Sequence, residues 1–160
     1  MPKLDERSPQ ALAVLRIMAA LLFMEHGLMK LAHFPAAQPG VPSPLPPILV
    51  AAAWIELAGG ALIVVGLFTR LAAFVCSGEM AAGYFMVHAA KGFWPALNGG
   101  DAAILFSFVF LYLVFAGGGA WSLDAVFQRR TPGTGSARPI IKGSAPPLTR
   151  DSSTRPQGNS

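Results

Sequence analysis

The sequence predicts an all-α membrane protein in which four transmembrane helices form an antiparallel bundle, followed by a disordered C-terminal tail. Of its 160 residues, 53% are hydrophobic and only 12% are charged, whereas a soluble domain carries roughly 25% charged residues. The mean hydropathy is +0.51. Four apolar segments run near residues 11–34, 46–68, 71–90 and 102–120. Each is close to the roughly 20 residues that a helix needs to cross the hydrocarbon layer.

The chain divides into three parts around these segments. Residues 1–10 are expected to form a short cytoplasmic lead, in which Ser8 caps the first helix and Pro9 begins it. Residues 11–127 form the membrane domain. Residues 128–160 are rich in Pro, Gly, Ser, Thr and Arg and are expected to be disordered, because they cannot bury a core. A cleaved signal peptide is the competing interpretation of the first segment, but that segment is too long and is interrupted by charged side chains.

The connections before the fourth helix follow from turn-forming residues. Prolines crowd residues 35–47, which blocks helix formation and predicts an extended first loop. The short segment 68–70 forces the second and third helices into a tight hairpin. The second loop covers residues 91–100, where Trp94 is expected at the membrane interface and the turn ends in a cap at Asp101.

The last membrane-associated element is a short interfacial helix expected over residues 122–127. It follows the glycines at 117–119 and Trp121, a second candidate interface residue. Its basic end would face anionic lipid.

The distribution of Lys and Arg predicts that both termini are cytoplasmic. With that orientation the outer side receives only Lys30 and Lys91, as the positive-inside rule requires. Arg16 and Arg70 are then expected to be anchors at the inner interface. The net charge of +4 reflects this topology, and no nucleic-acid partner is expected. The basic residues on the inner side are Lys3, Arg7, Arg16, Arg70, Arg129, Arg130 and those of the tail.

Cysteine and histidine contents narrow the chemistry further. Cys76 is the one cysteine in the sequence, which excludes an intramolecular disulfide and argues against a thiol relay. The three histidines, His26, His33 and His88, are too few and too scattered to predict a metal site.

Four ionisable residues lie within the apolar segments: His26, Lys30, Glu56 and Glu79. An ionised group near the bilayer centre costs about 2.5–3.5 kcal/mol on insertion scales. At 100° per residue, Lys30 shares a face with Gly27, and Glu56 shares a stripe of small residues that lets another helix approach. We therefore expect a polar pocket near the middle of the membrane, with Glu56 and His26 as its central pair.

Two further residues, His88 and Asp101, are expected at the outer mouth of this pocket. Less specific interpretations remain for several members. Lys30 can extend to the outer interface, Asp101 can serve only as a helix cap, and His88 can be an ordinary interface histidine. Glu25 points to the opposite side of its helix and can reach water or pair locally.

The chain resembles the DoxX family of small four-helix bacterial membrane proteins over about residues 12–125. Family members carry an acidic residue after the outer turn, commonly Glu, where this chain has Asp101. Glu25 and Glu79 are not part of the family pattern. The matching pieces are His26-Gly27 with Lys30-Leu31, Glu56 to Gly60, Gly66 to Arg70, His88 followed by Gly92-Phe93, and the glycine-rich turn before Ser122-Leu123-Asp124.

The resemblance implies a protein of the bacterial inner membrane and a link to quinone- or thiol/sulfur-dependent redox systems. The chain would be the membrane subunit of an oxidoreductase complex, with a membrane or peripheral redox protein as partner and quinone as the ligand. The alternative is a non-enzymatic assembly, chaperone or lipophile-binding protein, as among distant relatives. A stand-alone catalytic motif is not visible. Whether the chain is an enzyme and whether it forms a homo-oligomer both stay open. Transport is less favoured, because four helices are few for alternating access.

Overall fold

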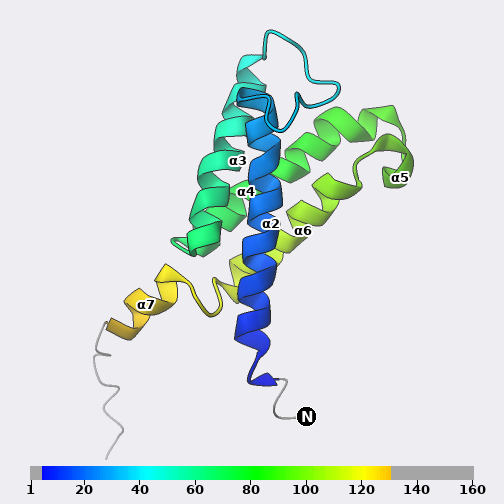
Figure 1. The fold of residues 1–160 in the computed structure, drawn as a ribbon. Helices are drawn as coiled ribbons and strands as arrows, with labels where there is room; N and C mark the ends of the chain where they lie inside the picture. The colour runs from blue at the N-terminus through cyan, green and yellow to red at the C-terminus, as the bar shows by residue number, and fades with distance from the viewer. Residues whose placement is uncertain (1–4, 131–160) are drawn as a thin grey trace, which may run out of the picture.

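The computed structural model describes residues 5–130, and this part of the chain contains helices and no strands (Figure 1). Of the tail predicted to be disordered, 128–160, residues 128–130 are helical, and residues 131–160 lie outside the described residues. The helices are, in chain order, α2 (Ser8–Leu31), α3 (Pro47–Val65), α4 (Thr69–Gly83), the π-helix η1 (Tyr84–His88), the 3-10 helix η2 (Ala89–Lys91), α5 (Pro95–Asn98), α6 (Asp101–Ala116) and α7 (Leu123–Arg130).

Three helical stretches are long and apolar enough to cross a membrane. They are α2 with 24 residues, α3 with 19, and the continuous run Thr69–Lys91 with 23. The fourth, α6, is apolar but has only 16 residues, which gives it a length of about 24 Å. The all-helical class with membrane-length helices is thus confirmed, whereas a regular bundle of four equal spans stays a prediction.

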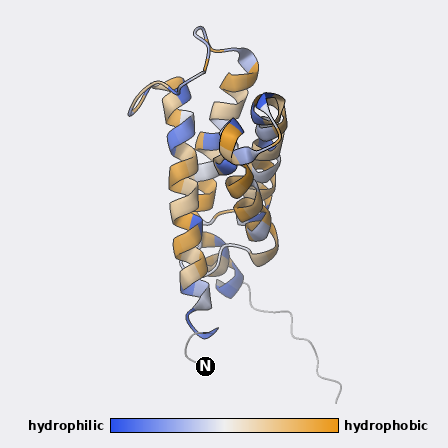
Figure 2. Ribbon diagram, turned by 90° about the vertical axis from the view of Figure 1, so that its right-hand side faces the viewer, coloured by the Kyte–Doolittle hydropathy of each residue, from blue (hydrophilic) through white to orange (hydrophobic). Residues whose placement is uncertain are grey.

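The helices pack as two pairs joined by the α3–α4 turn. α2 packs mainly on α3, and α4 packs mainly on α6, which runs obliquely to α2 (Figure 1). The helices are predominantly hydrophobic, and hydrophilic residues are found toward both ends of the molecule (Figure 2). Phe23 of α2, Ile63 of α3, Cys76 of α4 and Phe110 of α6 are fully buried and form the core between the pairs.

Small residues set the spacing of the helices. A Cβ atom on Gly27 would lie 2.8 Å from Leu57 Cγ and 2.9 Å from the Ala53 carbonyl oxygen, so only glycine allows α2 and α3 to approach here. Between α4 and α6, Ser77 Oγ donates to the Ser107 carbonyl at 2.8 Å, and Ser107 Oγ donates to the Ser77 carbonyl at 3.1 Å. These contacts fix the position of each helix on its neighbour.

Both predicted N-terminal caps are wrong. Ser8 is the first residue of α2, Arg7 holds the cap position, and no side chain caps that end. Asp101 is likewise the first residue of α6, behind an uncapped Gly100. Each polar residue was predicted at the cap position but is the first residue of its helix. Asp101 still lies in the first turn of α6, where the helix dipole stabilises a negative charge.

The C-terminal boundaries also shift. α6 ends at Ala116 rather than near residue 120, because Gly117 (φ 79°) and Gly119 (φ 66°) adopt left-handed conformations that other residues rarely take. α7 continues through Arg130, so the helical part does not stop at residue 127. The third segment is not one regular α-helix, since its last turns change to π and 3-10 geometry.

Candidate functional site

A buried ion pair joins α2 to α3 inside the membrane-length helices. Lys30 Nζ lies 2.5 Å from Glu56 Oε1, and the two side chains are only 8% and 1% exposed. Gly27 lies one turn before Lys30, and a Cβ atom there would be 3.2 Å from Glu56 Cβ. The close approach of the two backbones at Gly27 therefore brings the ammonium group onto the carboxylate. The second oxygen, Glu56 Oε2, is buried and has no hydrogen-bond partner among the described residues.

Glu79 adds a second carboxylate from α4. Its Oε2 atom is also buried and without a hydrogen-bond partner in the described part of the chain. The carboxylate lies within electrostatic range of both Glu56 and Lys30. Lys30 is thus paired directly with Glu56 and interacts with Glu79 at longer range. The three residues together carry a charge of −1 if all of them are ionised. Either acid can hold a proton, and the three side chains can donate to and accept from a polar ligand.

His26 does not occupy the position that the sequence suggested. Its Nδ1 atom is hydrogen bonded to the Leu22 carbonyl at 3.0 Å, and its ring packs edge-on against Phe106, with centroids 5.8 Å apart. The expected Glu56–His26 pair is wrong as a direct contact, because Lys30 is the residue that reaches Glu56. His26 still lies close enough to act on the Glu56 charge.

Neither His88 nor Asp101 forms a hydrogen bond or ion pair with Lys30 or Glu56 within residues 5–130. His88 Nδ1 lies 3.1 Å from the Asn98 carbonyl oxygen, and its ring stacks on Tyr84 with a centroid separation of 6.3 Å. Asn98, which sequence reasoning missed, is buried and its amide donates to the Gly92 carbonyl at 2.8 Å. His88 therefore helps to hold the loop after the π-helix.

Arg16, which we expected to anchor the chain at the inner interface, has a fully buried side chain. Its guanidinium group donates only to backbone carbonyls. They are those of Gly118 at 2.8 Å, Val64 at 2.5 Å, Trp121 at 3.1 Å and Ile63. Two of these acceptors end α3, where the helix leaves carbonyls without intrahelical partners. Arg16 thus ties three segments together at one end of the molecule.

The other expected anchors, Arg70, Trp94 and Trp121, all have exposed side chains. Arg70 Nη1 donates to the Val114 carbonyl at 3.1 Å, near the end of α6. The two tryptophans are 65% and 68% exposed, respectively. Their positions suit amphipathic side chains at a membrane boundary, which stays a prediction.

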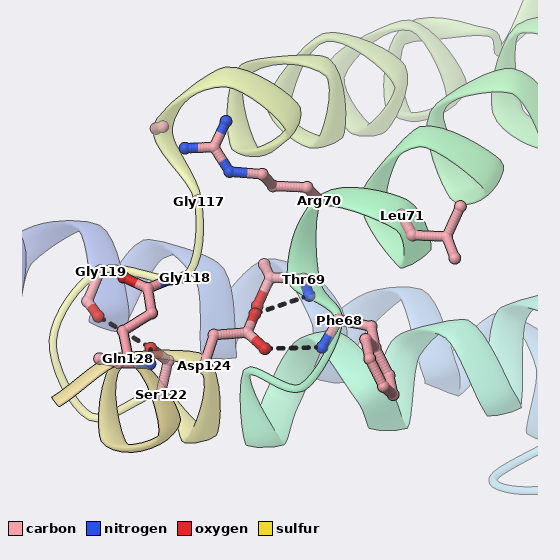
Figure 3. A pocket seen from close by; sticks show the side chains of 12 residues that line it. Phe68, Thr69, Arg70, Leu71, Gly117, Gly118, Gly119, Ser122, Asp124 and Gln128 are labelled. Carbon is pink, nitrogen blue, oxygen red and sulfur yellow. Dashed lines mark hydrogen bonds between the residues drawn. The ribbon is translucent and has the colours of Figure 1, made fainter. Parts of the chain in front are cut away.

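A cavity of about 390 Å³ lies between the α3–α4 turn, the loop of three glycines at 117–119 and α7 (Figure 3). The sequence did not predict this cavity, and none of the residues expected in the polar pocket lines it. Within the part of the chain described, no group of three or more His, Cys, Asp and Glu residues could hold a metal ion. The lining residues are Phe68, Thr69, Arg70, Leu71, Ala116, Gly117, Gly118, Gly119, Ser122, Asp124, Ala125 and Gln128.

Asp124 organises one wall of the cavity. Its two carboxylate oxygens accept the backbone N–H groups of Phe68 and Thr69, both at 2.9 Å, and so cap α4 from outside that helix (Figure 3). Burial raises the pKa of Asp124, but the hydrogen bonds from Thr69 and Phe68 and the positive charge of Arg16 outweigh it and leave the pKa below its ordinary value. The carboxylate is therefore ionised, and both of its oxygens are hydrogen bonded to the N-terminus of α4.

Comparison with known proteins gives two matches to these helices. A family model described as DoxX matches residues 11–89, a range that includes Lys30, Glu56 and Glu79. An uncharacterized protein from Haemophilus influenzae is 45% identical over 134 residues, which cover 81% of this chain and all of that relative. No solved structure matches the chain.

Proposed function

Because the chain belongs to the DoxX family of membrane proteins, we propose that it is the membrane subunit of a redox system and binds a quinone beside Lys30 and Glu56. The observation that carries the proposal is the incomplete pairing of the buried carboxylates. Glu56 Oε2 and Glu79 Oε2 are both buried without a hydrogen-bond partner among the described residues. Buried polar atoms are normally hydrogen bonded, and an exception calls for an explanation such as a ligand or a proton.

The chemistry of the three side chains suits a quinone head group. The Lys30 ammonium group is a donor for a carbonyl oxygen, and a protonated Glu56 or Glu79 carboxyl group is a second donor. In the proposed reaction, a partner redox protein supplies a pair of electrons, and the carboxyl groups pass a pair of protons to the quinone oxygens, giving the quinol. The acids then recover protons from water.

A lipophilic ligand would reach this group from the bilayer. Exposed apolar side chains cover α3 and the neighbouring helices, including Trp54 at 60% and Leu22 at 50%. Such surfaces suit contact with lipid. The proposal also places the protein in the bacterial inner membrane, as an antiparallel four-helix bundle with both termini cytoplasmic. The exposed Arg7, Arg70 and Arg129 belong to the start of α2, the start of α4 and α7, and these three segments lie toward the same end of the molecule (Figure 1), as the positive-inside rule requires.

Extraction of bound lipophiles tests the proposal. The protein is purified in detergent with native lipid, and bound quinone is quantified by mass spectrometry in the wild type, Glu56→Gln and Glu25→Gln. Glu25→Gln is a matched control, because it makes the same change on α2, in a residue without a hydrogen bond to this group. Glu56→Gln removes the acidic O–H donor and the carboxylate that positions Lys30, and the loss of about one hydrogen bond predicts about tenfold less quinone. The control should cause no change.

The alternative function is a non-enzymatic assembly or chaperone protein. It predicts that no quinone is extracted and that a client membrane protein is recovered in a fixed ratio. Equal quinone in all three preparations would also overturn the proposed site, since the ligand would then be dissolved in the surrounding lipid.

A further inference from the structure

We infer that the cavity between the α3–α4 turn and α7 is a binding site for a phosphodiester, that of an anionic phospholipid head group, held by Arg70. The cavity is separate from the Lys30–Glu56 pair, so this inference does not rest on the proposed function. Its volume of about 390 Å³ lies within the roughly 300–1,000 Å³ of small-molecule sites.

The charges around the cavity leave a net positive charge for a ligand. Asp124 and Arg70 line it, and the buried Arg16 lies behind one wall, where it holds the Gly118 carbonyl. Two arginines against one aspartate give +1. A phosphodiester carries one negative charge at neutral pH, so a single such group balances the site.

Several N–H groups of the residues that line the cavity have no hydrogen-bond acceptor within residues 5–130. Arg70 uses Nη1 for the Val114 carbonyl, and its exposed guanidinium group, which points toward Gly117 in Figure 3, has further N–H groups for a ligand. The N–H groups of Gly118 and Gly119 donate to no backbone or side-chain acceptor within residues 5–130. Free donors beside a guanidinium group match the oxygens of a phosphate ester.

The surroundings favour a lipid over a free phosphate. The cavity lies at the end of the membrane-length helices, and its rim carries Phe68 and Leu71, which are 65% and 66% exposed. Trp121, next to the lining residue Ser122, is 68% exposed. Large apolar side chains beside a cationic cavity can contact acyl chains while the phosphate is bound.

Binding of phosphatidylglycerol to the detergent-solubilised full chain tests the inference. Native mass spectrometry measures the bound fraction at increasing lipid for the wild type, Arg70→Gln and Arg129→Gln. The last variant loses the same charge on exposed α7, outside the cavity. We expect the affinity to fall about tenfold with Arg70→Gln and to stay unchanged with Arg129→Gln.

A second pair of variants distinguishes loss of the binding site from misfolding of Arg70→Gln, because these variants change the charge of the cavity and leave Arg70 in place. Gln128 is exposed and lines the cavity, so Gln128→Glu should weaken lipid binding and Gln128→Lys should strengthen it, without a change in the fold. Inorganic phosphate is titrated in parallel. Equal losses with Arg70→Gln and Arg129→Gln, no response to the Gln128 variants, or saturable binding of inorganic phosphate without binding of the lipid would each overturn the inference.

Discussion

Replacing Lys30 should reveal how strongly the buried ion pair holds α2 to α3. Lys30→Met keeps an apolar stem of similar length but leaves the Glu56 carboxylate, 1% exposed, without its cation. Breaking a buried pair by removing one partner typically costs about 3–5 kcal/mol. We expect the free energy of unfolding to fall by about 3 kcal/mol, toward the lower end of that range.

The magnitude follows from the geometry of the pair. At an N···O distance of 2.5 Å and an effective dielectric constant of about 20, the attraction is about 6–7 kcal/mol. Removing two ions from water costs several kcal/mol for each, so the complete pair is nearly neutral for stability. A carboxylate that has lost its cation can instead take up a proton, which at pH 7 costs about 3–4 kcal/mol for an ordinary glutamate. The free-energy cost of protonating Glu56 is therefore an upper limit on the stability that Lys30→Met loses.

Reversible unfolding in mixed micelles, followed by far-UV circular dichroism at increasing SDS, measures these differences. The double variant Lys30→Met with Glu56→Met should return to within about 1 kcal/mol of the wild type. Lys91→Met, at an exposed position of η2, should change stability by less than about 0.5 kcal/mol. If the single variant is as stable as the wild type, or the double variant is less stable than the single, the reasoning about the pair is wrong.

Other contacts lead to predictions in the same unfolding assay. Arg16→Lys should cost about 2 kcal/mol, since an ammonium group cannot replace the fork that reaches four carbonyls; a loss below 0.5 kcal/mol would contradict this role. Asp124→Ala should cost about 1 kcal/mol at neutral pH. Because the pKa of Asp124 is lowered by folding, its contribution is present above 3.8 and lost as the pH falls through the lower folded value, so a pH-independent difference from the wild type would be inconsistent. Ser77→Ala and Ser107→Ala should each cost about 0.6 kcal/mol, and the losses should add, since each hydroxyl group donates to a different carbonyl.

The sequence predicted the long apolar helices and the faces of α2 and α3 that carry Lys30 and Glu56, but it did not predict α5 or the π and 3-10 turns after α4. The apolar lengths located α2 and α3 to within a few residues, and helical geometry placed Lys30 on the Gly27 face and Glu56 on a face of small residues. Both faces are buried against each other in the structure. These features depend only on local periodicity, so a single sequence contains them.

The choice of partners did not follow from periodicity. His26 and Lys30 lie one helical turn apart on α2. Which of the two side chains contacts Glu56 depends on how far α2 is shifted along its axis relative to α3. Arg16 was misplaced for a similar reason: a basic residue near a helix end usually lies at the interface. Here the loop after α6 returns over the end of α3, and its Gly118 and Trp121 carbonyls enclose the side chain. Such long-range closure leaves no local signal.

A comparison of Arg16 with Glu56 shows why burial of a charge is not by itself a sign of function. Arg16 is fully buried, yet its hydrogen bonds reach four carbonyls that need donors, and a structural role explains it completely. Glu56 is equally buried, but one of its oxygens, like one of Glu79, has no partner among the described residues. Since an unpaired buried carboxylate is costly, selection for stability alone would favour a fully paired or apolar group. The unsatisfied oxygens, rather than the burial, are what favour a proton or ligand beside Lys30.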